Sequence, residues 1–127
     1  MDTQKHEWSH MEPLDFRELI GYAVYDKDGK KLGDVDAIWE DQKGHPAFMG
    51  VRTGVMGWSR MHAIPMPFAD VDEIGNRVIL PFEAKICLQA PAFDDDFEIT
   101  DETEKRIYDH FRKLGFSVED YVPWETV

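Results

Sequence analysis

Two apolar segments, 19–25 and 32–39, flank a turn that contains Gly29, and this pattern restricts the fold more than any other feature of the sequence. A glycine after an aspartate tolerates the positive φ of a tight turn between strands. In the second segment Asp34 and Asp36 alternate with apolar neighbours, which is the period of a strand with one face in water. The pattern therefore predicts a β-hairpin at the start of a β-rich domain.

Three further segments, 46–52, 59–65 and 77–80, contain apolar residues and are bounded by turn residues. They predict additional strands, and the first of them completes a meander of three strands. The segment 82–89 predicts a turn of helix that ends before Pro91.

The clearest helix is predicted at 101–114, directly after Thr100, whose hydroxyl can cap the first turn. Acidic residues follow at once, where they complement the positive end of the helix dipole. An apolar stripe runs along one face and consists of Ile107, Tyr108, Phe111 and Leu114. We expect this stripe to pack either on the strands of its own chain or on a second copy of the chain.

Length and composition predict one folding unit, because 127 residues with 43% hydrophobic side chains are enough for one continuous core. We expect a domain at 14–115 that includes the helix, with a flexible arm at 1–13 and a tail at 116–127. Strands first and one helix last is the order of a mainly β fold with an appended helix.

The chain carries a formal net charge of -12, from 26 acidic and 14 basic residues. The electrostatic field of such a negative charge repels phosphate backbones and anionic lipid headgroups. We therefore expect neither nucleic acid nor a membrane as a partner. Cys87 is the single cysteine and cannot form a disulfide within the chain, and residues 1–17 contain no apolar run. Both observations favour a cytoplasmic location.

Four landmarks, in this order, resemble the photosynthetic reaction-centre (PRC) barrel domain family. They are the hairpin at 19–35, the strand at 46–51, the stretch from Ile64-Pro65 to Pro81-Phe82, and Ala90-Pro91-Ala92-Phe93 before the helix. The resemblance implies a small barrel of about six strands with a C-terminal helix, often self-associating, that serves as a docking module. It implies no shared catalytic residues and no cofactor. Neither the membrane anchor nor the second barrel domain of the best-known members is present in the sequence, so we expect a stand-alone member.

The densest acidic stretch contains Asp94, Asp95, Asp96 and Glu98. Clustered carboxylates are the ligands that Ca²⁺ and Mg²⁺ prefer, so these four residues are a candidate cation site. The alternative is a solvated loop that leads into the acidic start of a helix.

No neighbouring nucleophile and base identify a catalytic arrangement, so we predict no catalytic residue and no enzyme. His62 lies between apolar residues in a predicted strand and is expected to be structural. Cys87 lies in an apolar segment and is expected to be a small buried hydrophobic residue. His6 and His10 are four residues apart and would share a face only if the arm were helical.

The number of large apolar residues in a small domain predicts a contact between two copies of the chain. Methionine and tryptophan suit adaptable contact surfaces. The candidate interface residues are Met56, Trp58, Met61 and Phe111. The sequence therefore predicts a non-catalytic binding or assembly module that forms a homodimer and contacts an unknown protein. The alternative is an acidic protein that binds Ca²⁺ or Mg²⁺.

Overall fold

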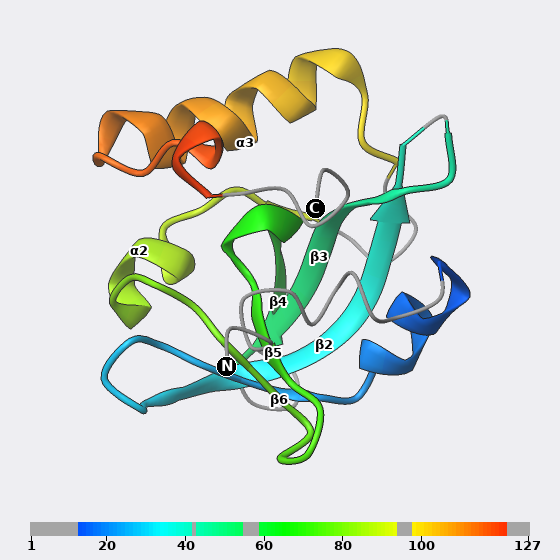
Figure 1. Ribbon diagram of the computed structural model, residues 1–127. Coiled ribbons are helices and arrows are strands. Elements are labelled where there is room, and N and C mark those ends of the chain that lie inside the picture. Colours follow the sequence, from blue (N-terminus) through cyan, green and yellow to red (C-terminus); the bar gives the residue numbers. More distant parts are fainter. Residues whose placement is uncertain (1–12, 42, 55–58, 94–97, 122–127) are drawn as a thin grey trace.

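The computed structural model describes residues 13–41, 43–54, 59–93 and 98–121, and one curved mixed sheet dominates them (Figure 1). Its strand order is β5-β6-β1-β2-β3-β4-β7. The strands are β1 (Ala23–Tyr25), β2 (Lys31–Glu40), β3 (Pro46–Thr53), β4 (Arg60–Pro65), β5 (Asp70–Asp72), β6 (Arg77–Ile79) and β7 (Ala92–Phe93). The helices are η2 (Pro13–Leu19), η3 (Met66–Phe68), α2 (Ala84–Leu88), α3 (Asp101–Lys113) and η4 (Val118–Asp120). This architecture confirms the predicted mainly β fold with a C-terminal helix.

The predicted meander is formed by β1, β2 and β3, which pair antiparallel in sequence order. β2 and β3 form the longest pairing and curve together through the molecule (Figure 1). Asp34 lies opposite Arg52, and the register then shifts between Val35 and Ala37. Val35 is buried whereas Asp34 and Asp36 are exposed, so the predicted alternation is confirmed.

The segment 19–25 is not a single strand, in contrast to the prediction. The chain first forms the 3-10 helix η2, which ends at Leu19, and β1 begins only at Ala23. Gly21 lies between them with a φ of 100°, in the left-handed region that interrupts an extended segment. At Leu19, which has 0% of its surface exposed, the apolar signal reflects burial and not strand geometry, whereas Ile20 is 50% exposed.

The two edge strands of the described sheet, β5 and β7, were not predicted. They contain three and two residues, which is too short for an alternating pattern to be recognised. In β5 only Val71 is buried, between Asp70 and Asp72.

Helix α3 packs on the core of its own chain, which decides between the two packings that the sequence left open. It crosses one side of the sheet (Figure 1). Phe111 is 1% exposed, and its ring centroid lies 5.3 Å from that of Phe68 and 5.2 Å from that of Phe82. These three rings fill the space between α3 and the rest of the core.

The ends of α3 differ in how well they follow the prediction. Thr100 caps the helix as expected, because its side chain accepts a hydrogen bond from the backbone N–H of Thr103. Leu114, predicted to continue the apolar stripe, is 41% exposed because the helix ends at Lys113 and Gly115 turns the chain with a φ of 97°. No helix within the described ranges is long and apolar enough to cross a membrane.

The residues after α3 return to the core. The ring of Phe116 lies 5.2 Å from that of Phe82, and the ring of Tyr121 lies 5.0 Å from that of Phe68. The first residues of the predicted C-terminal tail therefore add to the aromatic cluster. The domain limits at residues 14 and 115 stay predictions.

Candidate functional site

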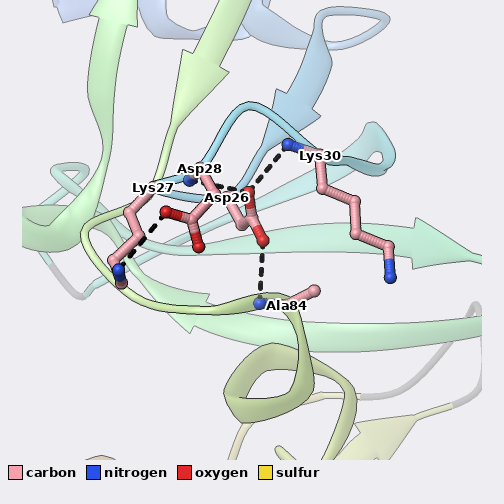
Figure 2. Close-up of polar contacts among 5 residues, drawn as sticks. All are labelled: Asp26, Lys27, Asp28, Lys30 and Ala84. Atoms are coloured by element: carbon pink, nitrogen blue, oxygen red, sulfur yellow. Dashed lines mark hydrogen bonds and ion pairs between the residues drawn. The ribbon is translucent and has the colours of Figure 1, made fainter.

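The turn between β1 and β2 is organised by the buried carboxylate of Asp26 (Figure 2). Its Oδ1 atom accepts hydrogen bonds from the backbone N–H of Asp28 at 2.9 Å and of Lys30 at 2.8 Å. Its Oδ2 atom accepts a third from the N–H of Ala84 at 3.1 Å. These hydrogen bonds, led by that from Lys30, lower the pKa of Asp26 because they stabilise the ionised form.

Asp26 is therefore part of the fold. Its bond to Ala84 joins the hairpin to the start of α2, and Gly29, with a φ of 86°, completes the turn that the sequence predicted. Because Lys30 is held to Asp26, the position at which β2 begins, Lys31, is fixed.

An open groove of about 510 Å³ begins at this end of β2. The residues that line it are Lys31, Leu32, Gly33, Asp34, Asp36, Arg52, Gly54 and Ser59. Two cationic and two anionic side chains face the groove, which makes it locally neutral in a chain with a net charge of -12. Binding sites are usually concave surfaces on which several polar groups converge, so this groove is the candidate functional site.

Arg52 lines the groove and is held by several neighbouring side chains. Its Nε and Nη2 atoms each lie 2.9 Å from Oδ2 of Asp36, and Nη1 donates to Oγ of Ser59 at 3.2 Å. Its Nη2 atom also lies 3.9 Å from the sulfur of Met61 on β4. The guanidinium is thus oriented by its neighbours while 29% of the side chain stays exposed.

Gly33 allows β2 and β3 to approach closely beneath the groove. A Cβ atom at this position would lie 1.9 Å from the carbonyl oxygen of Arg52, a distance that requires the strands to shift. Glycine in a strand commonly marks such a close backbone approach.

The second ion pair of the groove, Lys31 with Asp34, is looser. Its Nζ and Oδ1 atoms lie 3.5 Å apart, and the two side chains are 54% and 58% exposed. Exposed pairs of this kind contribute little to folding, so their charges stay available to a partner.

Three residues of the predicted cation site, Asp94, Asp95 and Asp96, lie outside the described residues. Glu98 is described and is exposed in the segment before α3. In the ranges that the structure describes, no three His, Cys, Asp or Glu side chains form a group that could hold a metal ion. The cation site stays a prediction.

Two of the four predicted interface residues, Met56 and Trp58, also lie outside the described residues. Met61 and Phe111 are each 1% exposed and pack inside the chain. A role for these four residues between copies stays a prediction, and the two described ones have little surface with which to contact a partner.

The reactive side chains singled out in the sequence are structural where the structure describes them. His62 is 2% exposed, and its Nδ1 atom lies 2.8 Å from the carbonyl oxygen of Ala90, to which it donates as an N–H. Burial lowers the pKa of His62. Burial also raises the pKa of the Cys87 thiol to about 12, so the thiol stays protonated near neutral pH.

Sequence reasoning did not find the groove. The alternation around Asp34 and Asp36 indicated a strand face in water, but it did not show that Arg52 lies beside them. Arg52 reaches this face through the register of β2 and β3, and Ser59, directly before β4, accepts a hydrogen bond from it. The one available signal was a charged residue, Arg52, at the end of the otherwise apolar segment 46–52.

The chain is similar to a known protein family and to solved structures. The family model described as PRC-barrel domain matches residues 11–85, more than half of the 127 residues. A solved chain from Pseudomonas aeruginosa, described as a 16S ribosomal RNA processing protein, RimM, is 17% identical with a TM-score of 0.43. The likeness covers 61% of this chain and 48% of that chain, so this chain spans about half the length of that protein. The search of curated proteins gave no match.

Proposed function

Because the chain belongs to the PRC-barrel domain family, we propose that it is a non-catalytic binding or assembly module. The family match over residues 11–85 carries this proposal, since the family resemblance implies a docking fold without shared catalytic residues. The module acts as a homodimer and contacts a further protein in the cytoplasm. Neither nucleic acid nor a membrane is a partner, because a net charge of -12 repels phosphate and anionic lipid.

The state of the reactive side chains supports a non-catalytic role. A nucleophilic cysteine works as a thiolate, whereas the pKa of Cys87 is raised to about 12 by burial. A histidine that acts as a base needs a free nitrogen at an accessible site, whereas His62 is buried and bonded to the backbone at Ala90. Both side chains stabilise the fold and do not face the groove.

The homodimer is tested by light scattering on the purified chain at micromolar concentration. We expect the mass of two chains, falling toward that of one chain on dilution. A monomer mass at every concentration contradicts this part of the proposal.

The protein partner is tested by affinity capture from the native cell, with the chain as bait. We expect one protein to be enriched over the recovery on an unrelated acidic bait of similar size. Equal recovery on both baits contradicts this part of the proposal.

The alternative function, binding of a divalent cation, rests on the acidic sequence from Asp94 to Glu98. Calorimetry with Ca²⁺ and with Mg²⁺ tests it directly. Heat of binding that is lost when Asp95 and Asp96 are changed to asparagine supports the alternative, and the absence of heat with both ions dismisses it.

A further inference from the structure

A contact between two copies of this chain must overcome their charge. Most small homodimers have two-fold symmetry, so the same surface patch of each copy meets itself. With a net charge of -12, most surface patches would then place like charges against each other. A dimer interface on this chain therefore requires a patch whose charges complement those of its own copy.

The groove over β2 and β3 meets this requirement. It holds Lys31 and Arg52 together with Asp34 and Asp36, and these side chains form two ion pairs within the chain. An ion pair is a dipole. A two-fold axis can place the dipoles of two copies antiparallel, so that the cation of each copy faces the anion of the other. The groove is thus complementary to itself.

The geometry of the groove also favours a contact with a partner. Arg52 is oriented by Asp36 and Ser59, so little side-chain freedom is lost when a partner meets it. Gly33 and Gly54 line the groove without side chains, and Leu32 adds apolar surface that is only partly buried. Arginine is enriched at protein interfaces, and partner backbone can approach closely at glycine.

We propose that the groove over β2 and β3 is the surface through which a second copy of this chain docks, about a two-fold axis that pairs Lys31 and Arg52 of each copy with Asp34 and Asp36 of the other. This inference rests on the proposed homodimer and names its interface.

Two charge-reversal variants, Lys31→Glu and Asp34→Lys, test the proposal. Both positions are more than half exposed, and both variants leave the Arg52–Asp36 pair in place, so the fold is preserved. Each variant alone places like charges across the two-fold axis. We expect the dimer dissociation constant to rise at least about ten-fold for each. An equimolar mixture should form the mixed dimer, which native mass spectrometry separates by mass.

The matched controls are Lys105→Glu and Asp109→Lys on α3, which change the net charge of the chain by the same amounts at an exposed ion pair away from the groove. They should dimerise like the wild type. Circular dichroism and thermal melting confirm that all four variants are folded.

The possible results distinguish an error in the proposed interface from an error in the proposed homodimer. Weakened dimers of the two groove variants, with a mixed dimer on combination, support the proposal. A wild-type dimer that both groove variants retain shows that copies meet through another surface, and it overturns this inference but not the proposed homodimer. A wild-type chain that is monomeric throughout overturns both.

Discussion

The region under α3 and the groove over β2 and β3 differ in the side chains that they place on the sheet. Under α3 the rings of Phe68, Phe82 and Phe111 fill the space, and the chain covers its own apolar surface. At the groove the side chains are charged and partly exposed, and their ion pairs leave a hollow open to solvent. The first region supplies stability, and the second is the region that we propose for binding.

Charged groups follow the same division. The carboxylate of Asp26 is buried and accepts three backbone N–H groups, so its charge serves the fold. The carboxylate of Asp36 meets a side chain that is itself partly exposed, in a groove that a partner can reach. The residue type does not separate the two, because both are aspartates of the hairpin, Asp26 directly after β1 and Asp36 within β2.

The largest effect is expected at Phe111. Phe111→Ala should lower the free energy of unfolding by about 3 to 5 kcal/mol, because it removes a fully buried ring and leaves a cavity. The loss should appear at every protein concentration, since the ring contacts its own chain.

Thermal and denaturant unfolding measure this loss, with Leu114→Ala as the matched control. Leu114 is 41% exposed, so its truncation should change the free energy by less than about 0.5 kcal/mol. If Phe111→Ala melts like the wild type, the region under α3 does not supply the stability assigned to it.

A smaller loss of unfolding free energy is expected from a change at Gly33, where β2 and β3 approach closely beneath the groove. Gly33→Ala should cost about 1 to 3 kcal/mol, because its Cβ would lie 1.9 Å from the Arg52 carbonyl oxygen and force the strands apart. Urea unfolding measures the loss, and Lys31→Ala next to it should be nearly neutral. An unchanged midpoint for Gly33→Ala would mean that β2 and β3 do not approach this closely.

The next effect is on the pH dependence of stability, and it is expected from His62, which lies in the core and not in the groove. Its folded pKa lies below the ordinary value of 6.5 because burial disfavours the charged ring. The unfolded chain therefore binds the proton more readily, so stability is complete above about pH 6.5 and falls as the pH drops below it. His62→Gln should flatten this part of the curve of unfolding free energy against pH.

The control for His62 is His45→Gln, since His45 lies in a turn and not in the core. This variant should keep the decline below about pH 6.5. If both variants keep the same pH dependence as the wild type, the decline comes from groups other than His62.

The smallest effect on folding is expected from the groove charges. Asp36→Asn removes an ion pair whose side chains are 29% and 47% exposed, and it should change the unfolding free energy by less than about 1 kcal/mol. A loss as large as that of Phe111→Ala would assign this pair to the core and remove the contrast between the two regions. Chemical denaturation in low and high salt makes the measurement.

The sequence predicted those features that depend on neighbouring residues. The turn at Gly29, the alternation around Asp34 and the cap at Thr100 are local, and the structure confirms each of them. The segment before Ala23 was misassigned, because an apolar run indicates burial in a 3-10 helix as readily as in a strand. The groove depends on Arg52 and Asp36, whose contact across two strands follows from a register that the sequence does not display.

The packing of α3 shows the same limit. The stripe on the helix was recognised from its spacing, but the same apolar face suits a core and a partner equally well. Only the three-dimensional position of Phe68 and Phe82 shows that Phe111 packs within the chain.

Hydrogen–deuterium exchange at two protein concentrations tests the central claim most directly, because it reports on both regions of one sample. If copies meet through the groove, peptides that cover 31–36 and 52–54 gain protection as the concentration rises from below to above the dimer dissociation constant. Peptides of α3, Asp101–Lys113, should exchange equally at both concentrations, since this helix packs on its own chain. Protection that rises with concentration in α3 but not in the groove would contradict the account.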